Sequence, residues 1–160
     1  MFRNIYEKVP TLNRLPFILS AAAISFTIYA CSSSSPDATA VLDGMLHRYA
    51  DFVLHMESDS IAALFTENGE VVNPHQPTVA GRDTILKYLN SFGDFKVLEE
   101  KMDADSTKVS GRTAVQTGHY FQRVTVPGGH TVEVSGRFRI YWIMEKGKWL
   151  IRREETLAGK

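Results

Sequence analysis

Apolar residues recur every three or four positions after residue 36, which is the spacing of an amphipathic helix. The apolar positions of this first predicted helix are Val41, Leu42, Met45, Leu46, Tyr49, Phe52, Val53 and Met56. Ser35 fits its cap and Pro36 its first position, where proline leaves no amide hydrogen unpaired. A second, short helix is expected from Ser58 or Asp59, and a third after Gly81. The first half of the folded region is therefore predicted to be largely helical.

The pattern changes to extended strands from about residue 95 onward. Strands are expected over residues 95–104, 112–126, 131–145 and 148–157, separated by the turn residues Ser110-Gly111, Gly128-Gly129 and Lys146-Gly147. A shorter strand over residues 70–73 follows Asn68-Gly69 and ends at Pro74. Helices come first and antiparallel strands follow, so the predicted fold class is α+β.

Two short turns set the expected strand registers. A two-residue loop at Gly128-Gly129 pairs Val126 with Thr131, and one at Lys146-Gly147 pairs Glu145 with Lys148. One face of the sheet then collects Thr117, His119, Phe121, Arg123, Val134, Gly136, Phe138, Ile140, Met144, Trp149, Ile151, Arg153 and Glu155. This face is the more apolar, so we expect it to face the helices. The convex face is expected to carry Gln116, Tyr120, Arg137, Arg139, Tyr141, Arg152 and Glu154, with Arg139 paired to Glu154.

The first 30 residues have the pattern of an export signal. Basic residues precede an apolar segment over residues 15–30, which is short for a membrane-spanning helix. Ile28, Ala30 and Cys31 resemble a bacterial lipobox, although Tyr29 departs from the usual small residue, and an uncleaved signal anchor is the alternative. We expect a lipoprotein signal peptide over residues 1–30, a lipidated Cys31 with a serine linker over 31–36, and a folded domain over 37–160. The protein would then be lipid-anchored in the bacterial cell envelope, at the outer membrane facing the periplasm.

Charge and cysteine content narrow the possible partners. The 18 basic and 18 acidic residues cancel without forming a basic patch, so no nucleic-acid partner is expected. Cys31 is the only cysteine, which excludes an intramolecular disulfide and a zinc site of several thiolates. His47 and His55 are about two helical turns apart, too far to chelate one ion together. No metal and no cofactor are predicted, and phosphate-loop and nucleophile-elbow motifs are absent from the sequence.

Two segments carry a family resemblance. LFTENGEVVNP, residues 64–74, followed by Gly81-Arg82-Asp83, resembles the signature of nuclear transport factor 2-like proteins, especially their SnoaL-like branch. GRFRIYWIMEKGKWLI, residues 136–151, resembles the paired final strands of those domains. The resemblance covers about residues 37–157 and implies a curved sheet wrapped around a long helix, with a cone-shaped cavity. It also implies a homodimer through the convex face, where Tyr120, Arg137, Arg139 and Tyr141 are expected.

Ketosteroid isomerase, which shares this implied fold, needs a carboxylate base and an oxyanion hole built from a tyrosine and a protonated aspartic acid. The resemblance places Tyr49 where the isomerase tyrosine falls. The base position, before Pro74, holds Asn73, and the second acid falls near Ile140. An amide cannot shuttle a proton at neutral pH, so steroid isomerisation is not expected.

Other polar residues are expected to face the cavity. His119 is a candidate base, Arg153 and Glu155 are placed at the rim, and His75 follows Asn73. The catalytic candidates are His119, Tyr49 and Glu155, and the candidate ligand-binding residues are Tyr49, Asn73, His75, His119, Phe121, Phe138, Trp142 and Arg153. Each also has a purely structural interpretation: His119 packed against Phe138, Arg153 paired with Glu155, and the aromatic residues forming the core.

Three functions remain open from the sequence. The first is a lipid-anchored envelope protein whose domain binds a small, largely apolar organic molecule. The second is an enzyme of the SnoaL-like type, an isomerase, cyclase or hydrolase that uses acid–base chemistry. The third is a dimeric interaction or stress-related envelope protein with a filled cavity. The fold alone does not choose among them, because one architecture hosts unrelated functions.

Overall fold

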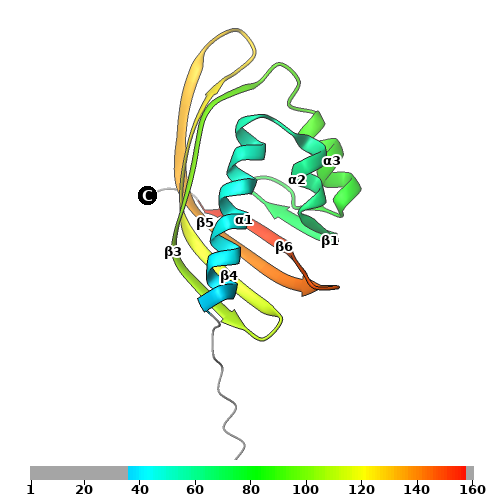
Figure 1. The fold of residues 1–160 in the computed structure, drawn as a ribbon. Helices are drawn as coiled ribbons and strands as arrows, with labels where there is room; N and C mark the ends of the chain where they lie inside the picture. The colour runs from blue at the N-terminus through cyan, green and yellow to red at the C-terminus, as the bar shows by residue number, and fades with distance from the viewer. Residues whose placement is uncertain (1–35, 158–160) are drawn as a thin grey trace, which may run out of the picture. The chain divides into compact units, whose positions relative to one another are not determined.

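Three helices cover one face of a six-stranded sheet in the computed structural model, which describes residues 36–157 (Figure 1). The helices are α1 (Pro36–Leu54), α2 (Ser58–Ala63) and α3 (Arg82–Asn90). The strands are β1 (Phe65–Val72), β2 (Val79–Ala80), β3 (Lys96–Ser110), β4 (Thr113–Thr125), β5 (Thr131–Glu145) and β6 (Lys148–Leu157). The α+β class is confirmed. The predicted signal peptide, Cys31 and most of the serine linker lie outside the described residues.

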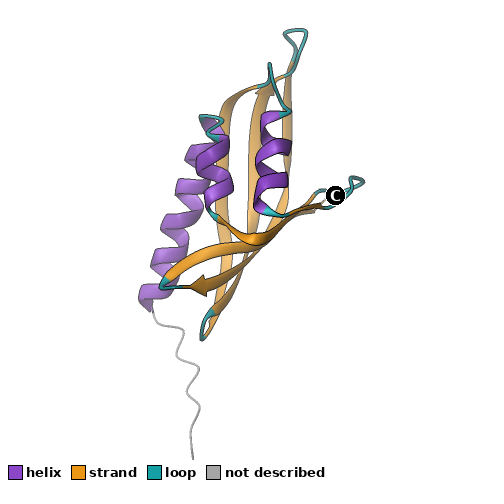
Figure 2. Cartoon of the chain, turned by 90° about the vertical axis from the view of Figure 1, so that its right-hand side faces the viewer, coloured by secondary structure: helices purple, strands orange, loops and turns teal. Residues whose placement is uncertain are grey.

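The sheet is mixed rather than wholly antiparallel. Its strand order is β2-β1-β6-β5-β4-β3, in which β1 runs parallel to β6 and the other neighbours are antiparallel. The helices α2 and α3 lie beside each other, and α1 runs along the same side of the sheet (Figure 2). The β4–β5 hairpin reaches past the end of α1 (Figure 1). Over residues 36–157, the helices are either too short or too polar to cross a membrane.

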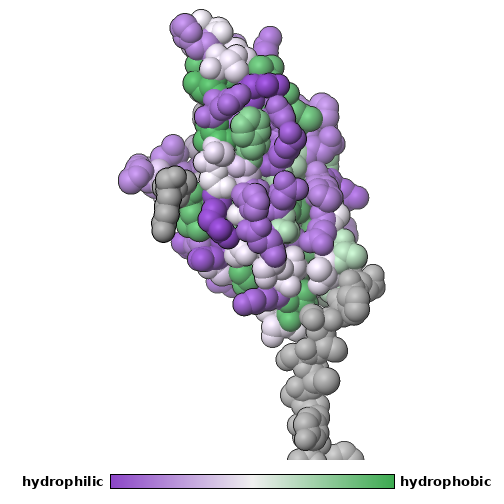
Figure 3. Space-filling view, turned by 90° about the vertical axis from the view of Figure 1, so that its left-hand side faces the viewer, coloured by the Kyte–Doolittle hydropathy of each residue, from purple (hydrophilic) through white to green (hydrophobic). Residues whose placement is uncertain are grey.

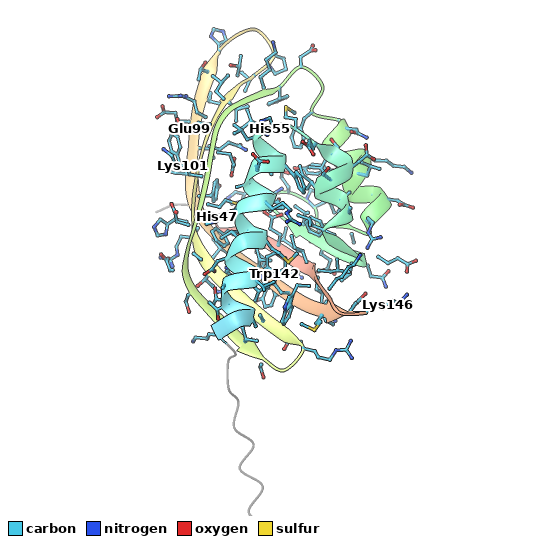
Figure 4. All side chains as sticks on the ribbon, in the orientation of Figure 1. His47, His55, Glu99, Lys101, Trp142 and Lys146 are labelled. Atoms are coloured by element: carbon cyan, nitrogen blue, oxygen red, sulfur yellow. The ribbon has the colours of Figure 1, made fainter. Side chains whose placement is uncertain are left out.

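The core lies between α1 and the long strands. The apolar face of α1 buries Leu42, Leu46 and Tyr49, as the helical spacing predicts. Their partners on the sheet include Phe138 and Trp142, both almost fully buried, and Trp142 lies between α1 and the strands (Figure 4). Burying such side chains is the main favourable contribution to folding, about 1.5–3 kcal/mol for each large apolar group.

The predicted register of the β4–β5 hairpin is wrong by one residue. Thr125, not Val126, pairs with Thr131, and the amide of Val126 donates to the His130 carbonyl at 2.8 Å. The loop therefore has three residues, 127–129, and its two glycines take φ values of 99° and 84°, which other residues adopt at a cost. A shift of one residue turns every β4 side chain to the opposite face. The residues of β4 that face the helices are Gln116, Gly118, Tyr120, Gln122 and Val124.

The β5–β6 hairpin begins in the predicted register and then loses it. Glu145 pairs with Lys148 as expected, but a bulge follows: Trp142 opposes Ile151, while Tyr141 opposes Arg153. Because of the extra residue on β6, each later side chain of that strand points to the opposite face from the one predicted. The residues turned outward are Arg153 and Glu155, and the one turned inward is Glu154. Arg139 accordingly pairs with Glu155, at 3.3 Å, and not with Glu154.

Close packing at the middle of the sheet requires a glycine. A Cβ atom at Gly118 would overlap the carbonyl oxygen of Asp103 and lie 2.7 Å from Cζ of Phe138. Gly118 pairs with Phe138 across β4 and β5, so the buried phenyl ring lies directly over the glycine. Any side chain here would have to displace backbone or a core ring.

The convex face, which the sheet turns away from the helices, is largely hydrophilic (Figure 3). It carries the ion pairs Arg123–Glu99, Arg137–Asp105, Arg139–Glu155, Arg153–Glu155 and Arg153–Glu70. Arg137, Arg139 and Tyr141 belong to this face as expected, whereas the expectation that Tyr120 does is wrong. The homodimer that this face was expected to form stays a prediction.

Candidate functional site

A buried carboxyl group lies between α1 and the sheet. Glu154 on β6 is 6% exposed, and its Oε2 accepts a hydrogen bond of 2.7 Å from the hydroxyl group of Tyr49 on α1. Tyr49 is itself 7% exposed. The β6 bulge is what turns Glu154 inward, because without it Arg153 would occupy the inner face.

The environment of Glu154 favours its protonated form. Burial raises the pKa of Glu154 to about 7, although the hydrogen bond from Tyr49 acts in the opposite direction. Within residues 36–157 no arginine or lysine forms an ion pair with this carboxyl group. Burial, reinforced by the charge of Glu154, also raises the pKa of Tyr49, which therefore remains a hydrogen-bond donor.

A second carboxyl group faces the same interior from β3. Glu100 pairs with Gln122 of β4, and the Gln122 Nε2 atom donates to Glu100 Oε2 at 2.8 Å. The pKa of Glu100 is raised to about 7, mainly by burial and also by the nearby charge of Glu154, while the hydrogen bond from Gln122 acts in the opposite direction. Both carboxyl groups therefore have pKa values near neutral pH, and the charge of Glu154 contributes to that of Glu100.

Further polar groups surround these carboxyls. Burial raises the pKa values of Tyr88 on α3 and Tyr120 on β4, and the charge of Glu154 contributes to both shifts. Asn73 donates from Nδ2 to the Tyr88 hydroxyl at 3.2 Å and accepts from the Thr156 hydroxyl at 2.7 Å. The position that would hold the isomerase base is thus a hydrogen-bonded amide beside Tyr88.

An apolar cavity of about 230 Å³ lies next to this polar cluster. It is lined by Val53, Met56, Ser58, Ile61, Leu89, Phe92, Phe95, Val97, Gln122, Val124, Val126, Val132 and Val134. Ser58 and Gln122 are the only polar residues in that lining. Gln122 joins the two features, since it lines the cavity and also bonds to Glu100.

The cavity is open at an apolar rim. Val132 and Val134 on β5 line it and yet are 41% and 43% exposed. Both residues lie near the start of β5, close to the β4–β5 loop. The apolar lining therefore continues to the protein surface at this end of the cavity.

Two of the predicted site residues lie on the convex face, not in the interior. His119 is exposed, with Nδ1 at 3.0 Å from Asp105 Oδ1. The ring of Phe121 faces outward, with the Lys101 ammonium 6.0 Å from its centroid, and Lys101 lies on the outer side of β3 (Figure 4). The expectation that His119 and Phe121 face the cavity is therefore wrong, because of the one-residue change in the β4–β5 loop.

Arg153 and Glu155 also turn outward. Arg153 Nε donates to Glu155 Oε1 at 2.7 Å, and Arg153 Nη1 donates to Glu70 Oε2 at the same distance. The expectation that Arg153 and Glu155 lie at the cavity rim is therefore wrong, because the bulge in β6 turns them outward. The structural interpretation, in which they pair with each other, describes them correctly.

The remaining predicted residues divide between core and loop. Phe138 and Trp142 are fully buried core residues, and Trp142 Nε1 donates to Gln116 Oε1 at 3.1 Å. His75 is exposed in the loop after β1 and has a φ of 61°. Tyr49 and Asn73 are the two predicted residues that the structure brings into the polar cluster.

Sequence reasoning missed Glu154, Glu100 and Gln122. Glu154 lies in the run Arg152-Arg153-Glu154-Glu155. All four residues are charged, so their polarity does not indicate which one faces inward. A strand with no alternation of polar and apolar residues is a sign of irregular pairing, and such a run at the end of β6 is the signal that was available.

Comparison with protein families identifies the fold. The SnoaL-like domain family matches residues 34–155. The chain belongs to this SnoaL-like family. Comparison with curated protein sequences finds no match.

Solved structures agree with the SnoaL-like assignment. A ketosteroid isomerase-like protein from Erwinia carotovora atroseptica superposes with a TM-score of 0.69 at 15% identity, covering 78% of this chain and 99% of that one. Aln2 from a Streptomyces species gives a TM-score of 0.66 at 14% identity, covering 76% and 91%. A putative calcium/calmodulin dependent protein kinase II association domain from Xanthomonas campestris gives 0.60 at 21% identity, covering 76% and 85%. At these identities the likeness establishes the fold and no more.

The SnoaL-like interior therefore combines two kinds of surface. One is an open apolar cavity, and the other is a pair of carboxyl groups that titrate near neutral pH beside tyrosine hydroxyls. Such a combination suits either the binding of a small apolar molecule or proton transfer to and from it.

Proposed function

We propose that this SnoaL-like domain binds a small, largely apolar organic molecule in its interior cavity. The observation that supports this most directly is the cavity of about 230 Å³ with an almost wholly apolar lining and an exposed apolar rim. Ligand pockets of proteins typically combine such a lining with a few polar groups that fix orientation. Here Gln122 supplies the polar group that leads toward Glu100.

Acid–base catalysis on the bound molecule is the second candidate function. It is favoured by the buried Tyr49–Glu154 hydrogen bond and by the two carboxyl groups with pKa values of about 7. A group that titrates near the working pH both accepts and releases protons efficiently. Asn73 offers no such exchange, so any proton transfer falls to Glu100 and Glu154, with Tyr49 as hydrogen-bond donor.

The protein would carry out this function while anchored in the bacterial envelope. Acylation of Cys31 after removal of residues 1–30 would hold the domain at a membrane, where apolar molecules concentrate. Cys31→Ser should release the protein from the membrane fraction or leave it uncleaved. Unchanged fractionation and an unchanged acylated N-terminus by mass spectrometry would rule out the anchor.

The binding proposal is tested by titrating the full-length protein with N-phenyl-1-naphthylamine, an apolar probe that fluoresces when it leaves water. Val134→Trp fills the cavity from its exposed rim, whereas Val41→Trp adds the same side chain at an exposed position of α1 outside the lining. The expected result is at least tenfold weaker probe binding for Val134→Trp and unchanged binding for Val41→Trp. Equal binding by both variants would overturn the proposal.

Catalysis is distinguished from binding with 4-tert-butylcyclohexanone in D₂O. An enzyme that removes and returns a proton beside a carbonyl group exchanges the α-hydrogens of this ketone for deuterium. Exchange that is lost in Glu154→Gln or Glu100→Gln supports the catalytic candidate. Tight binding without exchange supports the binding function alone.

A further inference from the structure

Gln122 faces two partners at once. Its side chain lines the apolar cavity, and its Nε2 atom donates to Glu100 Oε2 at 2.8 Å. A primary amide has a donor end and an acceptor end, so the end that a neighbour occupies determines which end remains for a ligand. The only other polar residue of the cavity lining is Ser58.

The oxygen of Gln122 is the end that Glu100 does not occupy. Within residues 36–157 no fully buried side-chain nitrogen or oxygen lacks a hydrogen-bond partner. The one hydrogen bond found for Gln122 there uses its nitrogen, so its oxygen retains accessible surface. The space that Gln122 lines is the apolar cavity, and an acceptor in such a space binds a hydroxyl or amine group of a ligand.

We propose that Gln122 is the residue that recognises the polar group of a ligand in the cavity, and that the protonation state of Glu100 controls which end of its amide is presented. The proposal rests on the proposed binding function and names the ligand class, an apolar molecule with one hydroxyl or carbonyl group. An ionised Glu100 only accepts hydrogen bonds, so Gln122 must turn its nitrogen to it and offer oxygen to an alcohol. A protonated Glu100 also donates, so the amide is free to reverse and offer its nitrogen to a ketone.

The surroundings of Glu100 place this change near neutral pH. Three groups face it from other elements: Tyr49 on α1, Tyr120 on β4 and Glu154 on β6. Burial and, to a smaller extent, the charge of Glu154 raise the pKa of Glu100 to about 7.

Solvent reaches Glu100 from the other side. A separate groove between α1 and β3 is lined by His47, Ala50, Asp51, Leu54, Glu100, Lys101, Met102 and Asp103. Protons therefore reach the carboxyl group through this groove without crossing the apolar cavity. The other titratable or charged residues that line this groove are His47 and Asp51 on α1 and Lys101 and Asp103, the neighbours of Glu100 on β3.

The test uses a matched pair of ligands, 4-tert-butylcyclohexanol and 4-tert-butylcyclohexanone, which displace N-phenyl-1-naphthylamine from the full-length protein at pH 5.5 and 8.5. The alcohol should bind at least fivefold more tightly than the ketone at pH 8.5. This preference should fall at least threefold at pH 5.5, mainly because the ketone binds more tightly there. A preference that does not change with pH would overturn the proposal.

Three variants separate Glu100 from other causes of pH dependence. Glu100→Gln should make the alcohol-to-ketone preference independent of pH, and Gln122→Leu should abolish the preference. Glu154→Gln should retain the change but move it to lower pH, because the charge that raises the pKa of Glu100 is gone. A change with pH that persists in Glu100→Gln would contradict the proposal. Failure of both ligands to displace the probe at either pH would instead contradict the binding function.

Discussion

The Tyr49 hydroxyl donates a 2.7 Å hydrogen bond to Glu154 Oε2, joining residues 105 positions apart in the sequence. This contact connects α1 to β6 inside the domain, and it supplies the buried carboxyl group with a neutral partner instead of a cation. A carboxyl group held in this way is more easily accommodated when it carries a proton. The interior therefore links the stability of the fold to pH.

Stability should decrease as the pH rises from 4.5 to about 7. The pKa of Glu154 is raised from 4.5 in the unfolded chain to about 7 in the folded one, so between these values the folded state binds a proton that the unfolded state has released. Because of this group, the free energy of unfolding should fall by on the order of 3 kcal/mol between pH 4.5 and pH 7. Urea denaturation at pH 5 and pH 8 should therefore give a lower free energy of unfolding at pH 8.

Two matched variants test whether Glu154 causes this pH dependence of stability. Glu154→Gln should lose a large part of this pH dependence and keep the part that Glu100, whose pKa is also raised to about 7, contributes in the same direction. Glu155→Gln removes the neighbouring carboxylate, which pairs with Arg139 and Arg153 on the opposite face of the sheet, and should keep the dependence. An unchanged dependence in Glu154→Gln would show that its carboxyl group is not buried as described.

Tyr49→Phe should destabilise the protein more at pH 8 than at pH 5. The hydroxyl group lowers the pKa of Glu154 by stabilising the ionised form, so its removal raises that pKa further. The expected cost at pH 8 is about 1.5–3 kcal/mol, the range for a hydrogen bond to a charged group. Tyr141→Phe is the control, since the Tyr141 hydroxyl lies 3.5 Å from Arg139 Nη1 on the convex face. Equal losses in the two variants would contradict the role assigned to Tyr49.

Gly118→Ala should be strongly destabilising, whereas Gly44→Ala should not. A Cβ at Gly118 meets a backbone carbonyl and a core ring, and the expected loss is at least about 3 kcal/mol. A Cβ at Gly44 on α1 meets nothing within 4 Å, and alanine there should stabilise the helix by about 0.5–1 kcal/mol. Thermal unfolding of both variants checks the pair, and a tolerated Gly118→Ala would contradict the packing of Phe138 over β4.

The sequence predicted the fold better than it predicted the site. The helical spacing of α1, the turn residues and the strand-rich second half were sufficient for the α+β class and the SnoaL-like resemblance. The orientation of individual side chains depends on single residues: one more residue in the loop before Thr131 and one more in β6 near Arg152. Each turns the side chains of a strand segment to the opposite face. The loop change leaves no distinctive hydrophobic pattern, and the β6 bulge leaves only the lack of alternation at residues 152–155.

His119 and Glu154 show how these two shifts change the predicted site. His119 was expected inside because the two-residue loop suggested by Gly128-Gly129 would place it opposite Phe138; it is exposed beside Asp105. Glu154 was expected outside, in an ion pair with Arg139, and is instead buried against Tyr49. Tyr49 lies on the buried face of α1 as the helical spacing predicts, and a one-residue shift in a strand does not change that face. Its role in binding or catalysis stays a prediction.

His119→Ala should leave ligand binding unchanged. The imidazole lies on the convex face beside Asp105, away from the residues that line the cavity. Probe titration of this variant should match the wild type within twofold, while Gln122→Leu should alter the choice between alcohol and ketone. A large loss of probe affinity in His119→Ala would mean that β4 turns its other face to the interior.

Methyl NMR of the protein with labelled valine, leucine and isoleucine, titrated with N-phenyl-1-naphthylamine, tests the central claim most directly. Binding in the cavity predicts that the largest chemical-shift changes fall on the methyl groups of Val97, Val124, Val132 and Val134, with Val41 unaffected. Changes centred on Val41 or on other methyl groups outside the cavity lining, or no saturable changes at all, would contradict it.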